Sequence, residues 1–586
     1  MQRIKGKAVS PGIVMGKALL YNSRQEIILH ERIGEGDVEK EIWRLSNAVK
    51  KAQAQLKKIH HDLQKMMGKD SALIIETQYM LLKDSNLIND IKDVIRKNLV
   101  KAEWAIKEID RKYFDVFNTL QDLAFKEKSN DISDALNRII ANLMKNGQPE
   151  MKMNFENIIL VADSISPSEA AKLMSRKQLL GLVLNKGGET SHTVILARAM
   201  GIPAILETVH ATEWIADGDW IAVDSIAGEV VVNPTRNVIA EITIKQNKYR
   251  IYKERLGAVS KLPDLTRDEK SFHLYANIEL PFESETIQAY GARGIGLFRT
   301  EFLYLDSKTS LAEEEQCLIY KSIAQRIYPH PLVIRTFDLG RDKIDSQADH
   351  KPEENPSLGM MAVRLFLKKK DLFKTQIRAI QRANDSGNIR ILFPMISEIE
   401  EVHAVRDLIR ETREELVKEG RFPKKEIKVG IMLEIPAAVK LIPHVKNEID
   451  FFSVGTNDLI QYLLAVDRNN SAVSYLFSPF HPAVVQTLDE IRREAEKIGK
   501  EVTICGEMAG MIYPALMLLG IGFTRFSMNP LAIAEIKRVF TSVRFATVRN
   551  IVRRLLTLSS RTEIEEYLVE SLLRKYPKLF IHQPLL

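Results

Sequence analysis

Eight short apolar segments alternate with amphipathic helical segments through the C-terminal half of this 586-residue chain. Each apolar segment has the length of a buried strand, and each segment that follows carries apolar residues with a helical period. Eight such β/α repeats over about 300 residues are the number that a (β/α)8 barrel requires. An open, doubly wound sheet would show the same alternation and remains the alternative fold. The predicted strands are FHLYANIE (272–279), GIGLFRTEF (294–302), PLVIRTFDLG (331–340), IRILFPMI (389–396), IKVGIMLEIP (427–436), FFSVGTND (451–458), VTICGEMAG (502–510) and FTRFSMN (523–529).

A second group of strand-like segments lies in the N-terminal half of the chain. Residues 1–20 read as short strands around the turn Ser10-Pro11-Gly12. The later runs are rich in Val, Ile and Leu, which is typical of buried strands in an α/β unit. They are NIILVAD (157–163), LLGLVLN (179–185), IPAIL (202–206) and WIAVDSIAGEVVVN (220–233).

Within this second group, the segment between residues 1–20 and the run at 157–163 has a different composition. From about Gly36 to Gly147, glycine and proline are almost absent, and apolar residues recur at positions i, i+3 and i+4. This pattern predicts a helical hairpin bundle inserted into the α/β domain. After that domain, a long connecting helix is expected at 238–259, followed by the link KLPDL. The helix and the link are the candidate hinge between domains.

We therefore expect a multidomain α/β protein in which an α/β domain contains an inserted helical bundle and precedes a C-terminal (β/α)8 barrel similar to a TIM barrel. The expected boundaries are 1–20 and 148–235 for the α/β domain, 21–147 for the helical subdomain, 236–270 for the linker helix and 271–575 for the barrel domain.

Composition excludes several classes of function. The chain has 84 Lys and Arg against 77 Asp and Glu, and no basic tract concentrates its net charge of +7, so no nucleic-acid partner is expected. Its two cysteines, Cys317 and Cys505, exclude a disulfide framework and fit a reducing compartment. Neither a secretory signal nor an apolar run of about 18 residues is apparent. We expect a cytoplasmic enzyme that does not insert into a membrane.

One candidate nucleophile follows a pair of glycines. In the motif GGETSHT, Gly187 and Gly188 allow a tight turn, and Thr190 or Ser191 can cap the helix that follows. His192 would then lie at a helix N-terminus, where the unpaired N–H groups favour negative charge. Such a histidine suits a phosphoryl group, although a histidine that only helps to cap the helix would fit the same motif.

A second group of polar residues lies in the predicted barrel, and all of them except Arg468 stand where a predicted strand ends. Arginine side chains are suited to the oxygens of phosphate and carboxylate, and paired carboxylates suit a hard divalent cation such as Mg²⁺. Together they predict a small, strongly anionic, phosphorylated substrate. Each residue taken singly could instead form a structural salt bridge. The residues are Arg299, Arg335, Glu434, Asn457, Asp458 and Arg468.

The two cysteines are interpreted differently. Cys505 ends a predicted strand and is followed by Gly506 and Glu507, so its thiol could transfer a proton at a carbon centre or act as a nucleophile. A cysteine in a strand is more often a small core residue, which stays the alternative. Cys317 lies in a helical context, AEEEQCLIYKSI, and is interpreted as structural.

The motifs together resemble a known family over essentially the whole chain. They are GGETSHT with ILARAMGIPAIL, GLFRTEFLYLD, VIRTFDLGRDK, ENPSLGMMAVR, FPMIS, LEIPAA, FFSVGTNDLIQYLLAVDRNN and CGEMAG. This set resembles the enzyme I family of the bacterial phosphotransferase system, the phosphoenolpyruvate–protein phosphotransferases. Phosphoenolpyruvate synthase and pyruvate phosphate dikinase share the barrel motifs more loosely, but they require an additional ATP-binding domain for which no segment fits here.

The resemblance implies a role for each candidate residue. His192 would take the phosphoryl group of phosphoenolpyruvate, and Cys505 would protonate the departing enolpyruvate to give pyruvate. Mg²⁺ would be the cofactor. By the same resemblance, substrate binding falls to Arg299, Arg335, Asn457, Asp458 and Arg468, and metal binding falls to Glu434 and Asp458.

The resemblance also implies partners. Phosphohistidine would donate its phosphoryl group to a histidine of the small carrier HPr, which docks on the helical subdomain, in the first step of sugar uptake. The family dimerises through the barrel domain and is cytoplasmic. Two alternatives remain: a paralogue that feeds a regulatory, nitrogen-type carrier, and a non-catalytic phosphocarrier or scaffold. Retention of the candidate catalytic and metal-binding residues disfavours the scaffold.

Four positions depart from the family pattern. Arg341 and Glu207 stand where glycine is usual, and Ala170 stands where a threonine that reaches the active histidine is expected. Lys128 replaces an arginine in the helical subdomain. These departures leave the expected barrel chemistry intact and bear on the carrier partner and the rate of transfer.

Overall fold

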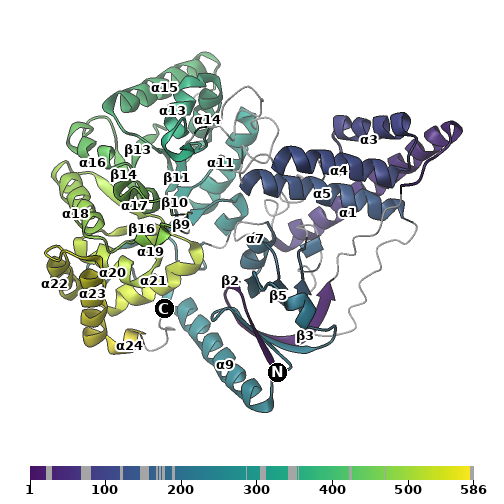
Figure 1. Cartoon of the computed structure of the whole chain (residues 1–586). Helices are drawn as coiled ribbons and strands as arrows, with labels where there is room; N and C mark the ends of the chain where they lie inside the picture. Colours follow the sequence, from purple (N-terminus) through teal and green to yellow (C-terminus); the bar gives the residue numbers. More distant parts are fainter. Residues whose placement is uncertain are drawn as a thin grey trace. The chain divides into compact units, whose positions relative to one another are not determined.

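The structure is a computed structural model, and its chain divides into two compact units, Met1–Tyr252 and Lys253–Leu586 (Figure 1). It describes residues 1–21, 30–67, 79, 81–118, 123–144, 157–165, 169–170, 173, 179–187, 192–285, 287–301, 303, 312–340, 353, 355–421, 425–468, 470 and 472–580. Within these residues, no helix has the length and apolar character needed to span a bilayer.

The first unit is built on a mixed sheet of eight strands in the order β1-β8-β7-β3-β4-β5-β6-β2. Strands β3 to β6 are parallel to one another, and the other pairs are antiparallel. The strands are β1 (Gln2–Lys5), β2 (Lys7–Ser10), β3 (Ile13–Tyr21), β4 (Ile158–Ala162), β5 (Leu179–Leu184), β6 (Ala204–Leu206), β7 (Trp220–Asp224) and β8 (Glu229–Val232). Residues 1–20 contain β1, β2 and most of β3, and each of the four later apolar runs predicted as strands contains one or two of the remaining strands.

The helical block is an insertion between two neighbouring strands. β3 and β4 are paired, with Lys17 opposite Ile158, although more than a hundred residues separate them in the chain. The intervening helices pack on one another through fully buried apolar residues such as Leu45 and Ile139. They are α1 (Val38–Met67), α3 (Ser85–Asn98), α4 (Ala102–Asn118) and α5 (Leu123–Leu143). The predicted helical insertion is therefore confirmed.

The second unit contains a closed barrel of eight parallel strands, in which β16 pairs with β9. This closure confirms the barrel and excludes the open sheet. The strands are β9 (His273–Ile278), β10 (Ile295–Phe298), β11 (Leu332–Arg335), β12 (Ile389–Phe393), β13 (Lys428–Leu433), β14 (Phe451–Gly455), β15 (Glu501–Cys505) and β16 (Arg525–Met528).

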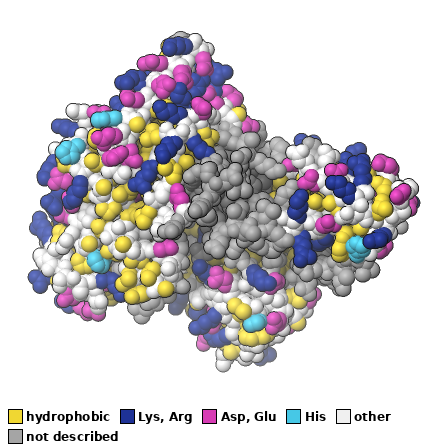
Figure 2. Space-filling view, turned by 45° about the horizontal axis from the view of Figure 1, so that its top comes forward, with side chains coloured by type: hydrophobic (Ala, Val, Ile, Leu, Met, Phe, Trp, Pro, Cys, Tyr) yellow, Lys and Arg dark blue, Asp and Glu magenta, His cyan; other side chains and the backbone are white. Residues whose placement is uncertain are grey.

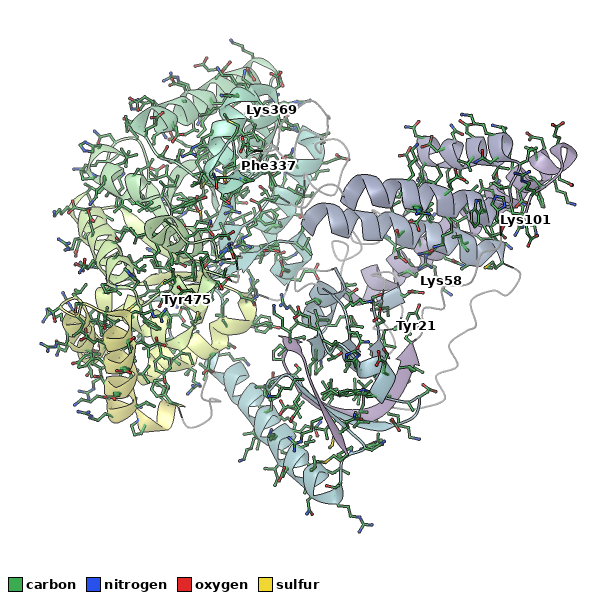
Figure 3. The ribbon with its side chains drawn as sticks, viewed as in Figure 1. Tyr21, Lys58, Lys101, Phe337, Lys369 and Tyr475 are labelled. Carbon is green, nitrogen blue, oxygen red and sulfur yellow. The ribbon has the colours of Figure 1, made fainter. Side chains whose placement is uncertain are left out.

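Two layers of apolar contacts hold the barrel together. Inside it, Leu297, Val333, Leu392, Met432, Phe451 and Cys505 form one buried cluster. Outside it, the strands pack against helices through a larger cluster that includes Phe337, which is labelled in Figure 3. The ring centroids of Phe337 and Phe366 lie 5.5 Å apart. The longer helices of this unit are α11 (Glu313–Ile327), α14 (Lys370–Ala383), α15 (Ile399–Lys418), α18 (Pro482–Lys497), α20 (Ile512–Ile521), α21 (Pro530–Ser542), α22 (Phe545–Leu555) and α23 (Arg561–Lys575).

The outer surfaces of these helices carry both signs of charge. Arg378 of α14 contacts Glu313 of α11 and Glu419 at the end of α15, with a nitrogen–oxygen distance of 2.6 Å in each pair. On the face shown in Figure 2, Lys and Arg side chains are interspersed with Asp and Glu side chains. The near balance of charges in the sequence therefore extends to this surface.

The predicted connecting helix is present as α9 (Arg236–Val259), and the division between the units falls within it. The link that follows is fastened to the barrel unit. The Asp264 carboxylate, which is 1% exposed, lies 2.7 Å from Nζ of the buried Lys537 and 2.5 Å from Nε of Arg293. Asp268 accepts hydrogen bonds from the backbone N–H groups of Phe545 and Ala546. These contacts hold the link to the barrel unit.

We expect Asp264→Ala to lower the free energy of unfolding of the barrel unit by about 3–5 kcal/mol, because it leaves the Lys537 ammonium buried without its carboxylate partner. Urea unfolding followed by a probe in this unit measures the change. The control is Asp407→Ala, which removes an exposed pair with Arg410 and should alter stability very little. Equal losses in the two variants would contradict the expectation.

Candidate active site

Six of the predicted site residues lie where barrel strands end. Arg335 and Cys505 are the last residues of β11 and β15, and Arg299 directly follows β10. Glu434 directly follows β13, whereas Asn457 and Asp458 lie in the first turn of α17 (Thr456–Leu464), which begins at the end of β14. Because all eight strands are parallel, these positions share the carboxyl end of the barrel, the end that carries active sites in this fold.

Arg335 is held by two carboxylates that the sequence analysis did not select. Its Nη2 lies 2.8 Å from Oε1 of Glu301, and its Nη1 lies 2.8 Å from Oδ2 of Asp338. Burial opposes the charged guanidinium, but Glu301 and Asp338 outweigh it and raise the pKa of Arg335. Its Nε is buried and has no hydrogen-bond partner among the described atoms. The guanidinium is thus fixed in place with one donor still available.

Arg299 has a similar arrangement on the neighbouring strand. Its Nη1 lies 2.5 Å from Oε1 of Glu279, a carboxylate that follows β9. Its Nε is also buried without a partner in the described part of the chain. Two oriented arginines, each with an unused N–H group, are suited to binding the oxygens of an anionic substrate.

Glu434 has the carboxylate most affected by its surroundings. It is fully buried, and its Oε1 accepts a hydrogen bond of 2.7 Å from the backbone N–H of Met395. Burial, together with the negative charges of Asp338 and Asp458, raises its pKa well above the usual value. Oε2 has no hydrogen-bond partner among the described residues. A buried carboxylate oxygen without a donor requires either a proton or a cation.

These residues fit a divalent cation of the Mg²⁺ type. Mg²⁺ is commonly held by one or two carboxylates, with waters and substrate phosphate completing its shell. Glu434 and Asp458 follow the paired strands β13 and β14 and supply two carboxylates. Within the described residues, no group of three or more His, Cys, Asp and Glu side chains is close enough to hold a metal by itself. The two carboxylates fit a Mg²⁺ ion whose remaining ligands are waters and substrate phosphate.

Asn457 and Cys505 are joined through the loop after β15. Nδ2 of Asn457 donates to Oε1 of Glu507 at 3.2 Å, and the backbone N–H of Glu507 donates to Oδ1 of Asn457 at 3.3 Å. Gly506, which lies between Cys505 and Glu507 in the chain, has a φ of 108°, and a Cβ atom at this position would lie 2.5 Å from Oγ1 of Thr456. Only glycine accommodates this turn, which places the carboxyl ends of β14 and β15 close together.

The Cys505 thiol is fully buried inside the barrel. Burial raises its pKa to about 11, while the hydroxyls of Ser453 and Ser527 and the charges of Arg335 and Arg299 act in the opposite direction. The thiol is therefore protonated at neutral pH and can act as an acid. Cys317 is buried in the core on α11, in agreement with a structural role.

Arg468 is the exception among the barrel residues. It follows α17 in a loop, its side chain is exposed, and its backbone N–H donates to Oε1 of Gln461 at 3.4 Å. No described contact joins its guanidinium to the other predicted site residues. Its assignment to the substrate stays a prediction.

His192 belongs to the first unit and is the first residue of α7 (His192–Ala199). Nε of Arg198 on this helix donates to the backbone oxygen of Val9 at 2.7 Å, and Oγ1 of Thr193 donates to that of Ile165. The predicted position of His192 at a helix N-terminus is confirmed. The described part of the structure does not include the His192 side chain, Gly188, or the proposed caps Thr190 and Ser191.

Of the four residues that depart from the family pattern, Glu207 and Ala170 have described side chains. Glu207 has φ 55°, a left-handed conformation that glycine adopts at lower cost, so the residue is accommodated with strain where the family has glycine. Ala170 is buried. Arg341 and the side chain of Lys128 lie outside the described residues.

Comparison with known families assigns most of the chain. Residues 253–545 match the family model described as "PEP-utilising enzyme, PEP-binding domain". Residues 5–128 match "PEP-utilising enzyme, N-terminal", and residues 154–228 match "PEP-utilising enzyme, mobile domain". The first of these spans the barrel and every strand-end residue described above.

Curated relatives extend over nearly the full length. Phosphoenolpyruvate-protein phosphotransferase of Priestia megaterium is 35% identical over 566 residues, which cover 97% of this chain and 98% of the relative. The protein of the same name from Haemophilus influenzae is 35% identical, covering 97% of this chain and 99% of the relative. The chain belongs to the phosphoenolpyruvate–protein phosphotransferase family.

As a phosphoenolpyruvate–protein phosphotransferase, the enzyme uses phosphoenolpyruvate for phosphoryl transfer to protein. The match of the barrel to a PEP-binding domain agrees with the anionic substrate that the strand-end arginines predict. The carboxylates that hold those arginines were not among the residues predicted from the sequence. A signal was available, since Asp338 follows its partner Arg335 in the motif RTFD, and Glu301, the other partner of Arg335, follows Arg299 in the motif RTE.

Proposed function

We propose that the protein transfers the phosphoryl group of phosphoenolpyruvate to its own His192 with release of pyruvate, and then to a histidine of an HPr-type carrier. This would be the first step of phosphotransferase-system sugar uptake. The observation that carries the proposal is the grouping of two oriented arginines, two carboxylates and a buried thiol at one end of the barrel. Incubation with radiolabelled phosphoenolpyruvate and Mg²⁺ tests it, and the expected product carries acid-labile, base-stable phosphate.

Substrate binding in this proposal falls to Arg299, Arg335, Asn457, Asp458 and Arg468. The fixed guanidiniums would bind the phosphate and carboxylate oxygens and orient the phosphorus for in-line attack. Glu434 and Asp458 would hold Mg²⁺, which, when bound, neutralises charge on the phosphoryl oxygens. The imidazole of His192 would then form the N–P bond as the bond from phosphorus to the enol oxygen breaks.

Cys505 would complete the reaction. The electron pair of the enol system takes the thiol proton at the methylene carbon, the enol oxygen becomes the ketone oxygen of pyruvate, and sulfur retains the S–H electron pair as a thiolate. Conversion of enol to ketone drives phosphorylation of the imidazole. A thiol with a pKa of about 11 holds its proton until the enol is generated.

The two halves of the reaction require movement within the chain. His192 belongs to the first unit and the barrel residues to the second, so the units must approach one another for transfer from phosphoenolpyruvate. The α9 helix is our candidate hinge, because the KLPDL link is fastened to the barrel unit through Asp264. The boundaries 1–20 with 148–235, 21–147, 236–270 and 271–575 stay our proposed domains.

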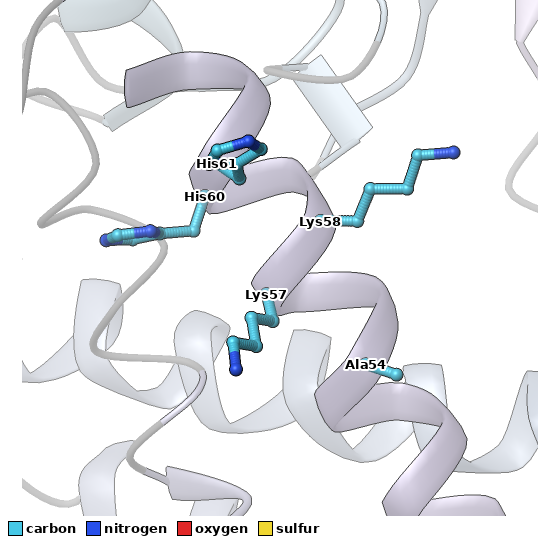
Figure 4. Close-up of a pocket in the computed structure, with 5 residues that line it drawn as sticks. All are labelled: Ala54, Lys57, Lys58, His60 and His61. Atoms are coloured by element: carbon cyan, nitrogen blue, oxygen red, sulfur yellow. The ribbon is translucent and has the colours of Figure 1, made fainter. Parts of the chain in front are cut away.

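The carrier is proposed to dock on the helical subdomain. A shallow hollow on α1 is lined by Ala54, Lys57, Lys58, His60 and His61 (Figure 4). Its lysines and histidines can form hydrogen bonds and ion pairs with acidic groups of a partner. Dimerisation through the barrel domain and a cytoplasmic location are further parts of the proposal, and both rest on the family resemblance.

We expect the double substitution Lys57→Ala/Lys58→Ala to slow phosphoryl transfer to an HPr-type carrier by about 10-fold or more, because two cationic contacts are lost from the docking surface. Labelling of the enzyme by phosphoenolpyruvate should not change. The matched control is Lys50→Ala/Lys51→Ala, since these lysines are also exposed on α1, two turns earlier. Equal transfer rates in both double variants would place the docking surface elsewhere.

A regulatory, nitrogen-type branch is the alternative to sugar uptake. The same barrel chemistry would serve it, and the acceptor alone would differ. Measurement of label transfer to each candidate carrier from the same genome separates the two. Faster transfer to a nitrogen-type carrier than to the sugar-branch carrier would favour the alternative.

A further inference from the structure

The sulfur of Cys505 is surrounded by polar groups from three other barrel strands. Cys505 lies opposite Gly455 of β14 and Ser527 of β16 in the parallel register. Its Sγ is 2.8 Å from Oγ of Ser453 on β14 and 3.8 Å from the backbone oxygen of Gly296 on β10. The thiol is therefore enclosed by hydroxyl and carbonyl groups in addition to apolar side chains.

The two serine hydroxyls differ in whether they can donate a hydrogen bond to sulfur. Oγ of Ser527 lies 2.5 Å from Oδ1 of Asn277 and 3.2 Å from the backbone oxygen of Ala276. A carbonyl oxygen only accepts, so the single proton of Ser527 is directed away from sulfur. For Ser453, sulfur is the sole hydrogen-bond partner of the hydroxyl among the described residues. The proton of Ser453 is thus available to Cys505.

Proton donation would leave a charge in this enclosed place. When the Cys505 proton passes to the methylene carbon of enolpyruvate, sulfur becomes a thiolate inside the barrel, where an uncompensated charge is costly. Arg335 and Arg299 are the charged groups that favour the thiolate. A hydroxyl 2.8 Å from sulfur supplies a directed hydrogen bond in addition to their charges.

We propose that Ser453 is a positioning residue for the proton transfer, whose O–H donates a hydrogen bond to sulfur and stabilises the Cys505 thiolate. This inference rests on the proposed function, because it assumes that Cys505 is the proton donor. Ser527, whose hydroxyl proton is directed to Asn277, contributes less to the thiolate. Ser453 is thus expected to stabilise the Cys505 thiolate more than Ser527 does.

Exchange of the methyl protons of pyruvate in D₂O tests this directly, since the reverse step needs the thiolate as a base. With the full-length enzyme, Mg²⁺ and pyruvate, loss of the methyl signal is followed by ¹H NMR. We expect Ser453→Ala to slow exchange by about 10- to 100-fold, the effect of removing one hydrogen bond to a charged group. Ser453→Thr, which retains the hydroxyl, should restore most of the rate, and Ser527→Ala should have the smaller effect.

A spectroscopic measurement separates the hydrogen bond from general damage to the barrel. In a Cys317→Ala background, the S–H stretching band in the Raman spectrum belongs to Cys505 alone. Ser453→Ala should shift this band, because sulfur loses its 2.8 Å partner. The matched control is Ser284→Ala, a buried serine whose described hydrogen bonds are with Pro281 and Arg326 and not with the thiol. This control should leave both the band and the exchange rate unchanged.

The outcomes distinguish this inference from the proposed function. Exchange at the wild-type rate in Ser453→Ala, or a larger loss in Ser527→Ala than in Ser453→Ala, would overturn the inference. Wild-type enzyme that forms phosphohistidine but exchanges no methyl protons would overturn it as well, together with the role of Cys505. Normal exchange without labelling of His192 would contradict the phosphoryl acceptor and still support Ser453.

Discussion

A His192→Ala enzyme is expected to incorporate no phosphate from radiolabelled phosphoenolpyruvate, a loss limited only by the detection threshold. The reason is chemical, since the substitution removes the only imidazole proposed to form the N–P bond, and alanine offers no nucleophile. Binding of phosphoenolpyruvate to the barrel should persist, because its proposed ligands lie at or beyond the ends of β10, β11, β13 and β14 in the second unit. Calorimetric titration with phosphoenolpyruvate and Mg²⁺ measures that binding separately.

The control for this result is a second histidine of the same unit. His210 is exposed, and its Nδ1 lies 3.1 Å from Oε1 of Glu213. His210→Ala should label to the wild-type extent, with phosphate that is lost in acid and retained in base. Stable labelling of His192→Ala at any other residue would show that the phosphoryl acceptor has been assigned wrongly.

A Cys505→Ala enzyme is expected to bind phosphoenolpyruvate normally and to form pyruvate about 10²- to 10⁴-fold more slowly, the usual contribution of a positioned general acid. Rapid-quench measurement of pyruvate in a single turnover gives the rate. Since burial raises the pKa of the thiol to about 11, the proton remains bound from pH 7 to pH 10. The wild-type step should therefore show no loss of acid catalysis over this range.

The second cysteine provides the control for Cys505. Cys317 is buried on α11 in the outer core of the barrel and contacts no proposed site residue among the described ones. Cys317→Ala should leave the rate of pyruvate formation unchanged. Pyruvate formation at the wild-type rate in Cys505→Ala would remove the proton-donor role, and the proposal for Ser453 with it.

The arginines and carboxylates show which parts of the site could be predicted from the sequence. Placing Arg299, Arg335, Glu434 and Cys505 at strand ends was correct, because an apolar run stops where polar residues begin. Their partners were not predicted. Glu279 contacts Arg299 from the end of another strand, and such a contact depends on which strands are neighbours in the closed barrel.

Segment boundaries were predicted less well than segment types. The run PLVIRTFDLG was predicted as a strand over 331–340, whereas β11 covers only Leu332–Arg335. Beyond Arg335, the backbone N–H of Phe337 donates to Oε1 of Gln376, and that of Asp338 donates to Oε1 of Glu301. Side-chain oxygens thus accept the hydrogen bonds that backbone oxygens of a neighbouring strand would otherwise accept. Hydropathy does not predict this change of acceptor.

Local pattern was sufficient for everything that depends on chain neighbours: the eight β/α repeats, the inserted helices, the start of α7 at His192 and the family motifs. Four features depended on the tertiary structure: closure of the barrel, the pairing of Arg335 with Glu301 and Asp338, the Glu434 oxygen that has no partner in the described part of the chain, and the contact of Cys505 with Ser453. The physical reason is that burial and hydrogen bonding arise between residues far apart in sequence. Periodicity reports which face of a segment is apolar, but not which groups that face will meet.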